Sequence, residues 1–185
     1  EGEAEMEDME DEEDEEGEEE EEKEKKEEED VELVPFKGAL STSQGLRASR
    51  RPRAKRMLCA KRNLRDLTPA MAARLPEAAG LDASRNALAA VPPAVLARGT
   101  HLRQLDLSSN VIAAVGDELA ALTALRVLDI GLNSLAALPA AVWRLPALQA
   151  LYAPYCQIAE LNVPDEDTDT YAPLRVLVLT DNCLA

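Results

Sequence analysis

Apolar residues recur along residues 54–185 with a period of about 24 positions. One clear copy of the pattern reads Leu102, Leu105, Leu107, Asn110, Ile112, Val115. The position that Asn110 fills recurs at residues 62, 86, 110, 133, 156 and 182, at separations of 24, 24, 23, 23 and 26 residues. This regular spacing predicts a repeat architecture in which each unit packs against the next.

Each copy predicts a short strand followed by a turn. Leu105 and Leu107 are two residues apart, so a strand through them places both side chains on one face. The asparagine follows where the chain turns away, and we expect its side chain to hydrogen-bond backbone groups of the neighbouring turns. One such unit cannot bury its own leucines, so the copies must stack to form a continuous core.

The pattern L-x-x-L-x-L-x-x-N/C-x-L resembles the leucine-rich repeat family over roughly residues 54–185. Cys156 fills one asparagine slot, and the copies around Asn86 and Arg62 are weaker. Prolines such as Pro92 and Pro139, together with the 23-residue spacing, are similar to the intracellular Ras-group and scaffold-type repeats. The resemblance implies an α/β solenoid of about six repeats, the first degenerate and the last incomplete. It also implies a curved fold with parallel strands on the concave face and an irregular or helical convex side.

Charge divides the chain into unequal parts. The net charge is −16, but residues 1–32 hold 23 acidic residues and 3 lysines, so the rest carries about +4. We expect residues 1–32 to form a disordered polyacidic tail, because so dense a run of like charge buries no apolar surface. Residues 33–53 are expected to be a linker with a basic segment, followed by the solenoid over residues 54–185.

The outward positions of the concave face are the candidate binding surface. We predict contact with a protein partner through Asp82, Arg85, Asp106, Ser108, Asp129, Leu132, Tyr152 and Tyr155. Solvent-facing tyrosine is enriched at protein interfaces. The alternative for the two tyrosines is that they merely fit a short, irregular strand near Pro154.

Three of these candidates are aspartates at equivalent positions of successive copies. Side chains on neighbouring strands lie about 4.8 Å apart, so Asp82, Asp106 and Asp129 would repel one another unless a cation lies beside them. Arg85 and a basic partner are both candidates for that cation. The resemblance offers a second interpretation, in which Asp between the two leucines is a common filler.

No pattern in the chain indicates catalysis or a metal site, and we expect no enzyme activity, metal or cofactor. The alternating acids of residues 165–169 lack the glycine and glutamate of a calcium loop, since Thr170 and Val176 stand there. The three cysteines lack zinc-ligand spacing and are expected to be structural thiols. His101 is the single histidine, and no phosphate-binding glycine loop is present.

We therefore predict an intracellular protein-interaction module or scaffold, cytoplasmic or nuclear, without a membrane span. One alternative is an acidic-tail binder of basic proteins, similar to the acidic nuclear phosphoproteins that bind histones, although in that family the acidic tract follows the repeats. Another alternative is a regulatory repeat segment of a larger signalling enzyme. Nucleic-acid binding is disfavoured, because the acidic tail would compete with phosphates for basic groups.

Overall fold

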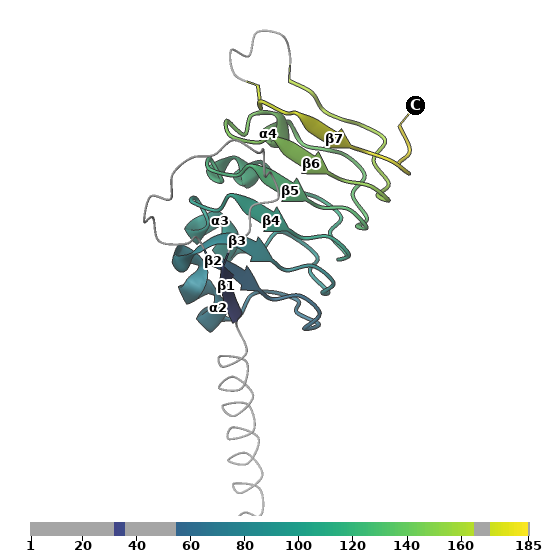
Figure 1. Cartoon of the computed structure of the whole chain (residues 1–185). Coiled ribbons are helices and arrows are strands. Elements are labelled where there is room, and N and C mark those ends of the chain that lie inside the picture. The colour runs from purple at the N-terminus through teal and green to yellow at the C-terminus, as the bar shows by residue number, and fades with distance from the viewer. Residues whose placement is uncertain (1–31, 36–54, 165–170, 185) are drawn as a thin grey trace, which may run out of the picture. The chain divides into compact units, whose positions relative to one another are not determined.

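The strands of the protein form one sheet in which the strand order follows the chain order (Figure 1). The computed structural model describes residues 55–164 and 171–184 in full and the backbone of residues 32–35. The strands are β1 (Glu32–Pro35), β2 (Lys55–Leu58), β3 (Ala78–Asp82), β4 (Gln104–Asp106), β5 (Val127–Asp129), β6 (Ala150–Tyr152) and β7 (Val176–Val178). The predicted polyacidic tail over residues 1–32 lies almost wholly outside the described residues, and Asp165, Asp167 and Asp169 lie outside them too.

The strands from β2 to β7 pair in parallel, and each repeat therefore contributes one strand to the sheet. Equivalent leucines stand side by side: Leu81 pairs with Leu105, Leu105 with Leu128, and Leu128 with Leu151. The parallel strands expected from the leucine pattern are thus confirmed, and the fold is of the α/β repeat class.

Short helices return the chain between strands. They are α2 (Pro69–Arg74), η1 (Leu75–Glu77), α3 (Pro93–Arg98), η2 (Asp117–Ala121) and α4 (Ala140–Trp143). Pro69 and Pro93 occupy first-turn positions, where the missing N–H costs nothing and the fixed φ favours a helix. In Figure 1 these helices lie together on one side of the sheet.

The core lies between the strands and these returning segments. The inner leucines of β3 to β6 are at most 1% exposed, and Val95, Leu119 and Val142 cover them from the helical side with no more than 1% exposure. In β7, Leu177 is 45% exposed. The difference follows from position, because β7 is the last strand of the described sheet and has a neighbour on one side only.

Asparagine side chains, two of them buried, join four of the repeats to the ones before them. Asn133, 7% exposed, accepts a hydrogen bond from the Ile112 N–H at 3.0 Å and donates to the Leu107 carbonyl at 3.1 Å, both in the preceding repeat. It also donates to the Ile130 carbonyl of its own repeat at 2.8 Å. Asn86, Asn110 and Asn182 repeat this arrangement. The expected hydrogen bonds to neighbouring turns are therefore present.

We call this series of asparagine hydrogen bonds the asparagine ladder. In one repeat Cys156 takes the place of asparagine, and its hydrogen bonds are weaker. The Cys156 thiol donates to the Ile130 carbonyl at 3.5 Å, and burial raises its pKa. Burial also raises the pKa of the Cys59 thiol, to about 11, so both remain protonated at neutral pH. All three cysteines are free, and Cys183 is exposed.

One strand was not expected from the sequence. Residues Glu32–Pro35 pair antiparallel with β2, at the start of the segment expected to be a linker. The backbone of β1 thereby occupies the edge of β2 that no earlier repeat covers.

We expect the asparagine ladder to matter most where it is most buried. Asn133→Ala leaves buried backbone groups on Ile112, Leu107 and Ile130 without partners, which predicts a loss of about 3 kcal/mol in the free energy of unfolding. Asn182→Ala is the matched control, because its bonds are partly exposed and water replaces them. Chemical denaturation measures both variants, and equal losses would contradict the burial argument.

Candidate functional site

One row of side chains crosses the face of the sheet opposite the core. The pairing register aligns Leu58, Asp82, Asp106, Asp129, Tyr152 and Val178, one residue from each of β2 to β7. We call these residues the strand-face row. All six side chains are partly exposed. In β3 to β6, the chain neighbours of each row residue are buried apolar residues that point to the core. The structure thus aligns the three predicted aspartates and Tyr152 on one surface.

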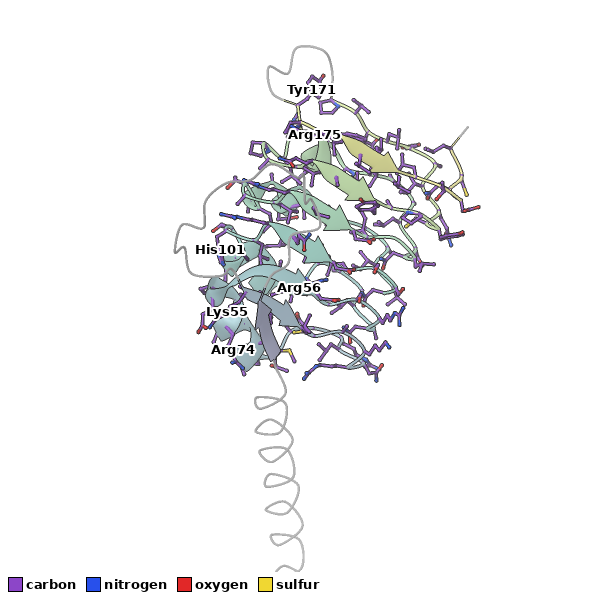
Figure 2. The ribbon with its side chains drawn as sticks, viewed as in Figure 1. Lys55, Arg56, Arg74, His101, Tyr171 and Arg175 are labelled. Carbon is purple, nitrogen blue, oxygen red and sulfur yellow. The ribbon has the colours of Figure 1, made fainter. Side chains whose placement is uncertain are left out.

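Arg56 provides the cation for two of the aspartates. Its Nη2 lies 3.1 Å from Asp82 Oδ2 and 3.8 Å from Asp106 Oδ2. Figure 2 shows Arg56 over the sheet, beside the strands that carry these aspartates. Arg85, which the sequence offers for this role beside a basic partner, is exposed in the turn after β3 and forms no ion pair with any described residue. The first repeat, whose copy of the pattern is degenerate, supplies the cation instead.

Asp129 lacks the support that the other two aspartates receive. Asp82 Oδ1 and Asp106 Oδ1 each accept a hydroxyl hydrogen bond of 2.7 Å, from Ser84 and Ser108 respectively. The equivalent residue beside Asp129 is Gly131, which offers only its backbone N–H at 3.1 Å. Ser108 is therefore placed as a local partner of Asp106.

These differences perturb the acidity of Asp129. Burial raises its pKa above the ordinary value, and the charges of Asp106 and Asp82 raise it further, against the lowering effect of the Gly131 N–H. No cation among the described residues forms an ion pair with Asp129. Among the carboxylates of the strand-face row, Asp129 is therefore the one whose charged form a positive group of another molecule would stabilise most.

A second row follows the strands, at the turn before each asparagine slot. Lys61, Arg85, Ser109, Leu132, Tyr155 and Asp181 all have positive φ, between 53° and 61°. We call these residues the turn row. From Lys61 to Tyr155, each N–H donates to a carbonyl of the next repeat, as Leu132 does to Pro154 at 2.8 Å. From Lys61 to Tyr155, hydrogen bonds between repeats therefore accompany the left-handed backbone, although the side chains at these positions differ.

Two large apolar side chains occupy adjacent positions of the turn row. Leu132 is 52% exposed and Tyr155 is 58% exposed. Asn, Asp and Gly adopt positive φ more readily than Leu or Tyr, so the backbone conformation does not explain why Leu and Tyr stand here. With Asp129 and Tyr152, which are paired neighbours in the sheet, they form one continuous surface of two repeats. We call it the β5–β6 surface.

The two repeats of the β5–β6 surface approach closely at Gly131. A Cβ at this position would lie 2.6 Å from Cδ of Pro154 and 2.9 Å from its Cγ. Gly131 thus lets the turn after β6 pack against the turn after β5. Neither this contact nor the role of Arg56 was found from the sequence, although a glycine and a proline at equivalent positions of adjacent copies were a signal for the first.

The described residues hold no group of three or more His, Cys, Asp or Glu side chains placed to bind a metal ion. None of the helices in the described part of the chain is long and apolar enough to cross a membrane.

We expect Asp129→Asn to stabilise the protein in a pH-dependent way. A raised folded-state pKa means that the native state binds the proton more tightly, so wild-type stability falls as pH rises from the unfolded pKa through the folded one. The neutral amide of the variant has no such penalty, and its oxygen still accepts the Gly131 N–H. The variant should gain over wild type at pH 7, and the gain should vanish near pH 3, as measured by thermal unfolding across this range. An equal gain at both pH values would contradict the electrostatic explanation.

We expect Gly131→Ala to destabilise the fold by about 1–3 kcal/mol, because the added methyl group displaces the Pro154 ring. Pro154→Ala in the same chain removes most of the obstruction. The double variant should therefore be more stable than the sum of the two single effects predicts, in chemical denaturation. Additive losses would show that the two residues do not compete for the same space.

Comparison with known protein families agrees with the repeat geometry. Residues 100–158 match the family model for the leucine rich repeat, which spans β4, β5 and β6 together with Asn110 and Asn133. No curated protein matches the sequence. The match therefore shows similarity to the leucine-rich repeat family over residues 100–158.

Proposed function

We propose that the protein is an interaction module or scaffold that binds a protein partner on the β5–β6 surface. Leucine-rich repeats are protein-interaction modules in general, and the family is typically non-catalytic. The remaining candidates, Asp82, Arg85, Asp106 and Ser108, lie on the repeats before this surface and form its extension toward the first repeat. The free cysteines favour an intracellular setting, cytoplasmic or nuclear.

The observation that carries the proposal is the exposure of Leu132 and Tyr155 on backbone that disfavours them. Neither packing nor turn conformation calls for these side chains, whereas a partner that covers them gains apolar area from both. Tyrosine combines a large apolar face with a hydroxyl group and loses little conformational entropy on binding. Asp129 lies at the end of the neighbouring strand and adds a site for a basic group of the partner.

A second candidate function rests on the charge of the N-terminal segment. Its 23 acidic residues within residues 1–32 favour binding to basic proteins such as histones. In this case the acidic segment supplies the affinity and the repeats carry it. Affinity of this kind falls steeply as salt rises, whereas apolar contact on the β5–β6 surface depends on salt weakly.

We expect paired substitution on the β5–β6 surface to abolish specific capture of a partner. The full chain, Leu132→Asn/Tyr155→Asn, and Val111→Asn serve as baits in native lysate at low and moderate salt, with mass spectrometry as the readout. Asparagine tolerates positive φ, so the first variant should keep its fold. Val111 is 55% exposed in a neighbouring repeat but has negative φ, which makes it the matched control. Loss of the Leu132 and Tyr155 side chains should weaken binding of the partner at least tenfold.

A fourth bait, with the glutamates of residues 1–30 changed to glutamine, separates the two candidates. Partners that survive this change and moderate salt, but not Leu132→Asn/Tyr155→Asn, support the β5–β6 surface. Partners that are lost with the glutamine bait and kept by the other variants support the acidic-segment function and contradict the first proposal.

A further inference from the structure

Arginines recur at the position immediately before a strand. Arg103, Arg126 and Arg175 precede β4, β5 and β7, and Gln149 holds the same position before β6. Backbone hydrogen bonds fix these positions in a row. The Arg126 N–H donates to the Arg103 carbonyl at 2.9 Å, and the Gln149 N–H donates to the Arg126 carbonyl at 2.8 Å. The Arg175 N–H continues the row by donating to the Gln149 carbonyl at 2.8 Å. We call the three arginines the arginine strip.

The charges of the arginine strip have no partner in the described part of the chain. All three arginines are exposed, and none forms an ion pair or a side-chain hydrogen bond with a described residue. The segments that lead into β4 to β7 add Arg144 and contain no acidic residue; they are residues 99–103, 122–126, 144–149 and 171–175. Figure 2 shows Arg175 and His101 on the side of the sheet where the strands begin. This edge therefore carries a line of positive charge that the contacts of the fold do not use.

The spacing of the arginine strip suits an extended peptide that runs across the strands. Adjacent strands lie about 4.8 Å apart, and the strip covers three such spacings between β4 and β7, or about 14 Å. An extended chain rises about 3.4 Å per residue, so about five residues cover the same distance. Each guanidinium group binds a carboxylate through two parallel hydrogen bonds. A segment with acidic side chains at about three of five positions therefore pairs with all three arginines.

We infer that the arginine strip binds an acidic segment of a partner protein. Charge complementarity provides the attraction, and the backbone row holds the arginines in position before the partner arrives. The inference goes beyond the proposed function, because it concerns a separate surface. In the chain, β5 lies between Arg126 and Leu132, so the arginine strip and the β5–β6 surface meet opposite ends of the same strand.

The composition of this edge favours an acidic peptide over a nucleic acid. Proteins that bind single-stranded nucleic acids stack the bases on aromatic side chains. In the segments that lead into β4 to β7, Tyr171 is the single residue of the tryptophan, tyrosine and phenylalanine types. A nucleic acid also brings a continuous line of phosphates to a chain of net charge −16, whereas a short acidic segment brings few charges.

The inference is tested with the full chain and a fluorescein-labelled peptide of six glutamates, by fluorescence anisotropy at low salt. The strip variant is Arg103→Gln/Arg126→Gln/Arg175→Gln. We expect it to bind the peptide about tenfold more weakly than wild type, because three exposed charge pairs are lost. A peptide of six glutamines should not bind to wild type. The Arg103, Arg126 and Arg175 amides of 15N-labelled wild type should shift when the glutamate peptide is added.

The matched control is Lys61→Gln/Arg65→Gln/Arg85→Gln, which removes the same charge from exposed residues in the segments that follow β2 and β3. This variant should bind the peptide within twofold of wild type. Circular dichroism and thermal unfolding verify that both variants keep the fold. The titrations are repeated in chains whose glutamates in residues 1–30 are changed to glutamine, which lowers the repulsion between the chain and the peptide. All variants should then bind more tightly, and the strip variant should stay about tenfold weaker than its parent chain.

Three results would overturn the inference. Equal weakening by the strip and control variants would show that net charge alone attracts the peptide. Strip-dependent binding of a single-stranded dT12 oligonucleotide without binding of the glutamate peptide would make the strip a phosphate-binding surface. Loss of peptide binding in Leu132→Asn/Tyr155→Asn, with the strip variant unaffected, would place the acidic segment on the β5–β6 surface. Wild-type peptide binding by Leu132→Asn/Tyr155→Asn supports the inference whether or not this variant loses its captured partner, so the two proposals fail separately.

Discussion

The interaction on which the rest of the structure depends is the buried amide that joins one repeat to the next. Each asparagine of the ladder satisfies backbone groups on two turns at once, and at Asn133 these groups are buried. Because the acceptor and donor of one side chain reach in two directions, the turns are held in one register. The leucines of β3 to β6 then align and bury each other. Burial supplies most of the stability, but the amides decide which arrangement of the leucines is reached.

The same register of the repeats fixes the backbone conformation at the exposed turn positions. The left-handed backbone of the turn row lets each N–H group, from Lys61 to Tyr155, reach a carbonyl of the next repeat. Once the backbone is fixed from within, the side chain at the turn is not needed for folding. Leu132 and Tyr155 stand there in spite of a backbone preference for smaller or polar residues. The fold thus provides a rigid surface on which residue identity can be assigned to binding.

Charge is distributed over separate edges of this rigid sheet. Arg56 compensates Asp82 and Asp106, and Asp129 is left with a raised pKa at the start of the β5–β6 surface. Arg103, Arg126 and Arg175 carry the opposite sign immediately before β4, β5 and β7. A sheet that repeats one residue per strand turns a recurrent residue type into a line of like charge, and such a line attracts an extended partner of opposite charge. One repeat period therefore creates two surfaces of different chemistry.

Sequence alone determined the repeat period, the parallel strands, the buried leucines and the asparagine bonds, because each follows from a local pattern that recurs along residues 54–185. It also placed Asp82, Asp106, Asp129 and Tyr152 in one row, since the position within the repeat fixes the face of the strand. Only the tertiary structure decided the pairing of β1, the choice of Arg56 as the cation, and the contact of Gly131 with Pro154. These features join residues that lie 20 or more positions apart, and two of them involve segments without a clear copy of the pattern. Their geometry depends on how repeats pack in space, which no local period records.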